Sequence, residues 1–100
     1  MIEIEVVKKE KQYRIISKGH AGYAPEGEDI VCAGISSLML FLAGVAVCSD
    51  GELIEMKSGY TEVIMPENSR TKLVIESLKI TLETMRIRYE KYFSFSFAGV

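Results

Sequence analysis

The sequence predicts a small α+β domain in which two helices cover one β-sheet. Three observations point to this class: segments of alternating apolar and polar residues, an uncharged run of helical length, and a long segment with apolar residues at three- and four-residue spacing. The predicted order of elements is β-β-loop-α-β-β-α-β. Because strands and helices do not alternate strictly in this order, it favours an α+β sheet with both helices available to cover it.

A β-hairpin is predicted for the first 18 residues. Apolar residues alternate with glutamates over residues 2–6, which is the period of a strand with one buried face. Residues 8–12 form a polar turn, and residues 13–17 resume strand character. Residues 19–28 contain three glycines and one proline without apolar periodicity, so they are predicted to form a loop. A loop of this length in so small a domain tends to be functional or mobile.

An uncharged run of 20 residues, 30–49, is predicted to form the first helix. About 20 residues is also the length of a membrane span, so a membrane helix is one alternative. The run contains glycines and serines, however, lies between Asp29 and Asp50, and has no flanking Lys or Arg to set an orientation in a membrane. We therefore expect a helix buried on nearly every side, within the domain or partly against a second copy of the chain.

Three further strands are predicted in the second half of the chain. Residues 53–56 and 61–65 form two strands joined around Ser58 and Gly59, and Pro66 ends the second of them. Phenylalanines that alternate with serines predict a closing strand with an aromatic face, at Phe93, Phe95 and Phe97. No internal repeat or linker interrupts these segments, so a single domain over residues 1–100 is predicted.

A long second helix precedes the closing strand. Asn68 or Ser69 can cap its N-terminus. Its apolar residues recur at helical spacing and form a stripe for the core: Ile75, Leu78, Leu82, Met85 and Tyr89. A thinner apolar line falls on nearly the opposite side of the helix: Leu73, Ile80 and Ile87. This line packs either laterally beneath a neighbouring strand or against another copy of the chain.

The composition excludes several classes of protein. One histidine and two cysteines are too few for a four-ligand Cys/His zinc site, and they allow at most one internal disulfide. The formal charge of −2 and the lack of any block of five like charges argue against a protein that wraps nucleic acid or coats anionic lipid. The first residues lack the basic start and the cleavage site of a secretory signal. We expect a cytoplasmic protein without metal, cofactor, nucleic-acid partner or membrane partner.

His20 and Cys32 are the candidate catalytic pair. His20 lies at the end of the predicted hairpin, and Cys32 lies 12 residues later, where the first helix begins. In a first helical turn, unsatisfied backbone N–H groups and the positive end of the helix dipole favour a thiolate, and the same N–H groups can hold an oxyanion. If the loop doubles back, His20 can take the thiol proton and later return it to a leaving amine. These are the minimal requirements for acyl transfer.

Chance spacing is the competing interpretation, because free cysteine is among the most buried residue types. Asp29 is a helix N-cap, a group that orients the site, or both. Ser36 lies one turn after Cys32 on the same helical face. Cys48 follows Cys32 by 16 residues, on the order of 24 Å along one helix, so the two cannot form a disulfide within the chain. We expect Cys48 to be a small core residue, and a metal site of His20, Cys32 and one carboxylate stays an alternative.

The segment 19–36 resembles the ribosomal-processing cysteine protease Prp family. It contains Gly-His-Ala at 19–21, a glycine-containing loop, and Asp-Ile-Val-Cys-Ala-Gly-Ile-Ser at 29–36, with the 12-residue step from His to Cys seen in that family. Elsewhere the resemblance is one of length and element order. The resemblance implies that Cys32 is the nucleophile and His20 the general base. Substrate-binding or site-supporting roles are predicted for Gly19, Ala21, Gly22, Tyr23, Gly27, Asp29, Ala33 and Ser36.

The resemblance also implies a function. Members of the family are bacterial endopeptidases that remove a short N-terminal extension from large-subunit ribosomal protein twenty-seven, cutting between an aromatic and a small residue. They form homodimers, and residues 21–28 correspond to a mobile segment that orders over the substrate. We therefore expect a single cysteine protease domain with the ribosomal precursor as its substrate. The alternatives are a noncatalytic ribosome-assembly binding protein of the same fold, and a thiol redox sensor at Cys32, which has no resolving cysteine within reach.

Overall fold

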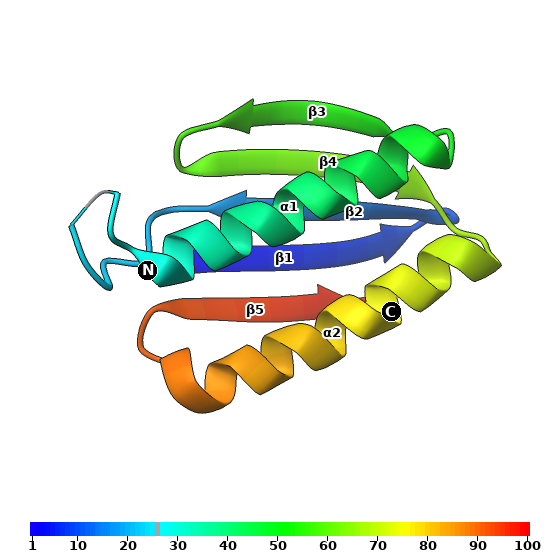
Figure 1. Ribbon diagram of the computed structural model, residues 1–100. Coiled ribbons are helices and arrows are strands. Elements are labelled where there is room, and N and C mark those ends of the chain that lie inside the picture. Colours follow the sequence, from blue (N-terminus) through cyan, green and yellow to red (C-terminus); the bar gives the residue numbers. More distant parts are fainter. Residues whose placement is uncertain (26) are drawn as a thin grey trace.

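Five strands and two helices follow one another in the predicted order β-β-loop-α-β-β-α-β, which confirms the α+β class. The computed structural model describes residues 1–25 and 27–100. Its elements are β1 (Ile2–Lys9), β2 (Gln12–Lys18), α1 (Ile30–Cys48), β3 (Glu52–Lys57), β4 (Tyr60–Pro66), α2 (Ser69–Tyr89) and β5 (Phe93–Ala98). Both helices lie on the same face of the sheet, roughly side by side (Figure 1).

The strands form one mixed sheet in the order β3-β4-β2-β1-β5. β1 pairs antiparallel with β2, β2 with β4 and β4 with β3, whereas β5 runs parallel to β1. The register of β2 and β4 places Lys18 opposite Tyr60, and the next residue, Gly19, donates its N–H to the carbonyl of Gly59 at 2.9 Å. The end of β2 and the β3–β4 turn are thereby fixed beside each other, although they are far apart in the sequence.

The core lies between the helices and one face of the sheet. Its strand residues include Ile2, Ile4, Val6, Tyr13, Ile15, Val63, Met65 and Phe93. The alternation predicted for the first strand is thus confirmed. The predicted stripe of α2 is confirmed as well, because Ile75, Leu78 and Leu82 are buried and Met85 and Tyr89 pack against the same core. Asn68 caps α2, and its side chain and that of Thr71 form a reciprocal capping box.

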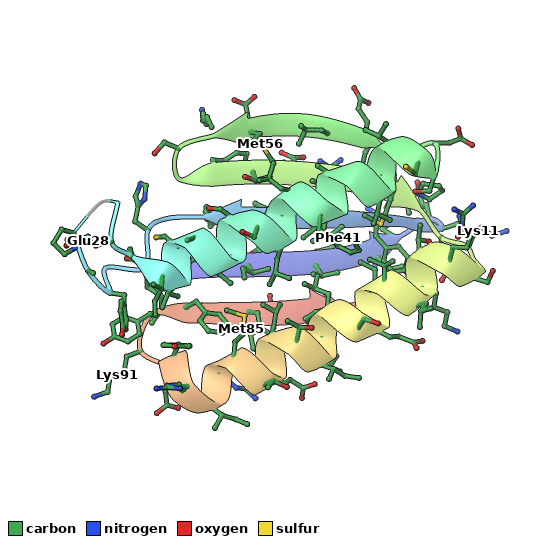
Figure 2. The ribbon with its side chains drawn as sticks, viewed as in Figure 1. Lys11, Glu28, Phe41, Met56, Met85 and Lys91 are labelled. Atoms are coloured by element: carbon green, nitrogen blue, oxygen red, sulfur yellow. The ribbon has the colours of Figure 1, made fainter. Side chains whose placement is uncertain are left out.

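Within one copy of the chain, the first helix is not buried on nearly every side, and the alternative that a second copy covers part of it stays a prediction. Residues on one side of α1 pack on the sheet, whereas Leu40, Phe41 and Val47 are 59%, 62% and 70% exposed (Figure 2). Both helices form a single layer on one face of the sheet, so no described element covers the outer side of α1. The length of α1 and its mean hydropathy of 2.4 would allow it to cross a membrane, and 33% of that segment is buried in this fold.

Two smaller expectations are also corrected. Cys48 is exposed rather than part of the core, because it lies on the outer side of the last turn of α1. The thin apolar line of α2 does not pack beneath a strand, since Leu73, Ile80 and Ile87 all point to solvent. The alternative for this line, contact with another copy of the chain, stays a prediction.

Candidate active site

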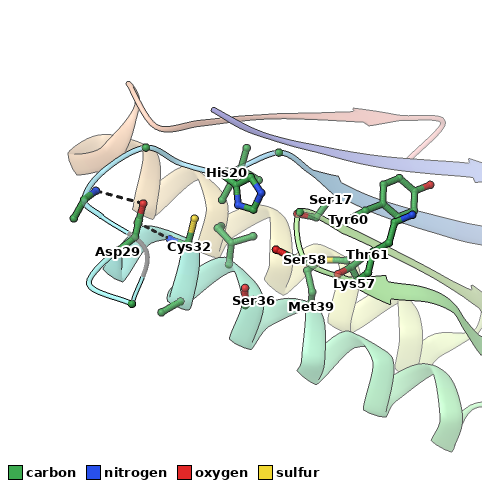
Figure 3. A pocket seen from close by; sticks show the side chains of 18 residues that line it. Ser17, His20, Asp29, Cys32, Ser36, Met39, Lys57, Ser58, Tyr60 and Thr61 are labelled. Carbon is green, nitrogen blue, oxygen red and sulfur yellow. Dashed lines mark hydrogen bonds between the residues drawn. The ribbon is translucent and has the colours of Figure 1, made fainter.

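The two residues of the predicted catalytic pair line the same groove. It has a volume of about 600 Å³ and lies where the start of α1, the segment after β2 and the β3–β4 turn meet (Figure 3). His20 and Cys32 both line it. Six other predicted site residues line it too: Gly19, Gly22, Gly27, Asp29, Ala33 and Ser36. Ala21 and Tyr23 are not in the lining, and the structure gives them other contacts.

The wall of this groove that faces α1 was not predicted from the sequence. That wall comes from the end of β2 and from the β3–β4 hairpin, and it includes Ser17, Lys57, Ser58, Gly59, Tyr60 and Thr61. The turn at Ser58 and Gly59 was visible in the sequence. Its place beside His20 was not, because that depends on the pairing of β2 with β4.

Cys32 occupies the first turn of α1, as predicted, and its side chain is half-buried. The backbone N–H of Ala21 donates to its Sγ at 3.2 Å. The loop therefore doubles back onto the helix start, and a hydrogen-bond donor adjacent to His20 in the chain points at the sulfur. This hydrogen bond fixes the position of the sulfur at the start of α1.

His20 lies two residues after the end of β2 and is exposed on the groove. Its ring lies between Cys32 and the turn that carries Ser58 (Figure 3). The backbone before it is held by the hydrogen bond from Gly19 to Gly59, and the backbone after it by the bond from Ala21 to Cys32. Two backbone anchors thus fix the position of a side chain that is itself open to solvent and to substrate.

Asp29 is the N-cap of α1, and its second carboxylate oxygen binds the loop, whereas its role in orienting the site stays a prediction. One carboxylate oxygen, Oδ1, accepts the N–H of Cys32 at 2.9 Å and caps α1. The other, Oδ2, accepts the N–H groups of Tyr23 at 2.9 Å and Ala24 at 3.4 Å. Burial acts to raise the pKa of Asp29, but the hydrogen bonds from Cys32, Tyr23 and Ala24 outweigh it and hold the pKa below its ordinary value. One carboxylate therefore joins the loop to the nucleophile's helix.

Replacement of Asp29 by alanine is expected to lower Tm by about 4 °C or more at neutral pH, because α1 loses its N-cap and the loop loses its anchor. Since the pKa is lowered in the folded state, this contribution is complete above the unfolded-state pKa and is lost as pH falls through the folded-state pKa. The Tm difference between the native protein and the variant should be constant near pH 7 and should narrow below about pH 4.

Asp29→Asn is the matched control for this prediction. Its amide oxygen still caps Cys32, but its NH₂ group cannot accept from Tyr23 or Ala24. Thermal melts should place its Tm between the native and alanine values. A Tm difference for Asp29→Ala that does not change on acidification would contradict the role assigned to the charge.

The same carboxylate changes the expectation for the oxyanion donors. The N–H groups of the helix start were predicted to hold an oxyanion. In the structure, however, the N–H of Cys32 donates to the Asp29 side chain, and that of Ala33 donates to the Asp29 carbonyl at 3.0 Å. These two donors already have acceptors, because an N-cap uses the same N–H groups that an oxyanion would need.

Tyr23 anchors the loop to the end of α2. Its ring packs edge-on against Tyr89 and Tyr92, with ring centroids 5.9 and 5.0 Å apart. Ser36 lies at the groove one turn after Cys32, as predicted, and is exposed. Glu26, which falls within the predicted loop 21–28, lies outside the described residues.

The metal site of His20, Cys32 and one carboxylate was the alternative to a catalytic pair. Across residues 1–25 and 27–100, the structure brings no three His, Cys, Asp or Glu side chains together in a way that could hold a metal ion. His20, Cys32 and Asp29 line one groove, but they do not form such a group.

A thiol in the first turn of a helix, with the only histidine of the chain in the same groove, is an arrangement typical of cysteine hydrolases. Comparison with known proteins makes this class specific. The family model described as cysteine protease Prp matches residues 1–94. The chain therefore belongs to the cysteine protease Prp family and is a cysteine-type peptidase.

Individual relatives agree with this assignment. The ribosomal processing cysteine protease Prp of Bacillus subtilis (strain 168) is 28% identical over 82 residues, which cover 72% of this chain and 73% of that protein. The Staphylococcus aureus protease Prp in complex with a covalently linked product peptide has a TM-score of 0.82 at 19% identity, covering 97% of this chain and 99% of that one. The same enzyme with a substrate peptide has a TM-score of 0.72 at 17% identity and the same coverage. These structures share the fold described above.

Proposed function

We propose that this protein is the endopeptidase that removes the N-terminal extension of large-subunit ribosomal protein twenty-seven, and that it acts in the cytoplasm, where ribosomal proteins are made. The observation that carries the proposal is the meeting of the Gly-His-Ala element and the Asp-Ile-Val-Cys element in one groove. Membership of the Prp family supports it, since the Bacillus subtilis relative is named as a ribosomal processing protease.

The proposed reaction has two steps. The Cys32 thiol gives its proton to His20, and the thiolate attacks the scissile carbonyl carbon. When the tetrahedral intermediate collapses, the carbon–nitrogen bond breaks and the leaving amine takes the proton from His20, which leaves a thioester on Cys32. Water then gives a proton to His20 and attacks the thioester, and the acid product leaves as the sulfur is reprotonated.

The groove suits a peptide backbone. Its lining includes the small residues Gly22, Ala24, Gly27 and Ala33. Small side chains leave room for the main chain of an extended substrate. The substrate is thus held by the groove while its scissile carbonyl reaches the start of α1.

Mass spectrometry of the ribosomal precursor, before and after incubation with the protein, tests this function. The expected result is loss of the mass of the N-terminal extension, which also gives the cleavage site. An intact precursor that forms a stoichiometric complex with the protein would instead support the noncatalytic binding protein. An intact precursor without any complex would exclude both.

We also propose that the protein is a homodimer through the outer side of α1 and the edge strand β3. Leu40 and Val47 of α1 are exposed, and they lie seven residues apart on one side of the helix. Leu53 and Met56 of the adjacent β3 are exposed too, and Figure 2 labels Met56 on this strand. Apolar side chains gathered on two neighbouring elements are typical of a surface covered by a partner.

Leu40→Glu is expected to shift this dimer to monomer, because a carboxylate would be buried without a partner in the interface. Sedimentation equilibrium over a concentration series measures the shift as a weaker dimer constant, by about tenfold or more. Leu73→Glu, in the exposed apolar line of α2 that is the alternative contact with another copy, should leave the constant unchanged if the dimer forms through α1 and β3. A monomeric native protein at high concentration, or an effect of Leu73→Glu alone, would contradict this interface.

A further inference from the structure

The β3–β4 turn touches the ring of His20 at a residue without a side chain. Gly59 has a φ of +75°, and a Cβ atom built on it would lie 2.8 Å from Nε2, 3.3 Å from Cε1 and 3.6 Å from Cδ2 of His20. Real Cβ atoms essentially never approach another atom below 3.0 Å. The imidazole therefore occupies the space that any other residue at position 59 would fill.

Main-chain pairing holds this contact in place. The carbonyl of Gly59 accepts the N–H of Gly19, the residue before His20, at 2.9 Å. The ladder of β2 and β4 continues from there, with Lys18 opposite Tyr60 and Ser17 opposite Thr61. The turn is consequently fixed to the same backbone that carries the ring, so it cannot move away without breaking the end of the sheet.

The direction of the ring follows from the three distances. Nε2 points at Gly59, and Nδ1 lies on the opposite edge of the ring, away from the turn. The ring as a whole lines the groove that also contains Cys32, so the turn sets where the imidazole stands in that groove.

We infer that Gly59 is a positioning residue for the general base: its lack of a side chain leaves room for the imidazole of His20 to stand in the groove that also contains Cys32. This inference rests on the proposed catalytic role of His20. It extends the site to a hairpin that the Gly-His-Ala and Asp-Ile-Val-Cys elements do not include. Gly59→Ala should displace the ring without removing any catalytic group.

The test compares Gly59→Ala with Gly99→Ala. Gly99 also has a φ of +75°, and its Cβ would meet the backbone of Lys8, so it reports the cost of alanine in this conformation far from the groove. Iodoacetamide alkylation of Cys32, followed over pH with Cys48 as internal reference, should slow about tenfold in Gly59→Ala. Because the chain has one histidine, a single Cε1–H NMR signal reports the ring, and it should move in Gly59→Ala alone.

A second measurement isolates the contact from the backbone strain. Removing the ring in His20→Ala makes room at position 59, so Gly59→Ala should lower Tm by several degrees less in that background than in the native one. If Gly59→Ala does not fold, the double variant should regain folding. Equal Tm losses in both backgrounds, or native alkylation and a native histidine signal in Gly59→Ala, would overturn the inference. If His20→Ala cleaves at the native rate, the proposed mechanism fails, whereas the coupling in Tm still reports the contact.

Discussion

Replacement of Cys32 by alanine is expected to remove precursor cleavage, by on the order of 10⁴-fold or more, because the reaction loses the thiol that forms the acyl intermediate. Cys32→Ser should be nearly as inactive, since a hydroxyl keeps its proton far more strongly than a thiol does. Cleavage of the precursor, followed by mass spectrometry, measures both variants.

The loss should be chemical rather than structural. Cys32 is half-buried, and its sulfur accepts the N–H of Ala21, a weak hydrogen bond whose loss costs little stability. Circular dichroism melts should therefore stay close to those of the native protein. Cys48→Ala is the matched control, because Cys48 is exposed at the other end of α1 and should be dispensable. Native cleavage by purified Cys32→Ala would refute the assignment of the nucleophile.

Local patterns in the sequence predicted the element order and most of the helix caps. The alternation before Lys8, the capping position of Asn68 and the first-turn position of Cys32 each depend on residues within a few positions of one another. Such signals survive in the folded chain because the interactions that create them are local. The Gly-His-Ala and Asp-Ile-Val-Cys elements were recognisable for the same reason.

What the sequence could not reveal depends on pairing between distant segments. Gly59 meets His20 only because β2 pairs with β4 rather than with β3. The sequence of an uncharged helix likewise does not show which of its sides other elements will cover. The exposure of Cys48 and of the outer side of α1 follows from the arrangement of both helices in one layer. The sequence also did not show which N–H groups at the start of α1 already have an acceptor. In the structure, the Asp29 side chain accepts the N–H of Cys32.

Replacement of His20 by alanine is expected to slow precursor cleavage about 10²- to 10⁴-fold, because both the removal of the thiol proton and its return to the leaving amine lose their carrier. Alkylation of Cys32 should slow as well, while that of Cys48 stays unchanged. The deficit in alkylation should shrink as pH rises, because hydroxide removes the thiol proton without help from an imidazole. The alkylation rates of Cys32 and Cys48, measured over a pH series in the native protein and in His20→Ala, test this expectation.

Chemical rescue separates a lost base from a damaged site. His20 is exposed on the groove, so its removal leaves a space that solvent can reach. Imidazole added to His20→Ala can enter this space and carry the proton, and it should restore part of the cleavage rate. The same imidazole should do nothing for Cys32→Ala, which has no thiol to activate. Rescue of neither variant, combined with unchanged Cys32 alkylation in His20→Ala, would show that the thiol is activated without the histidine.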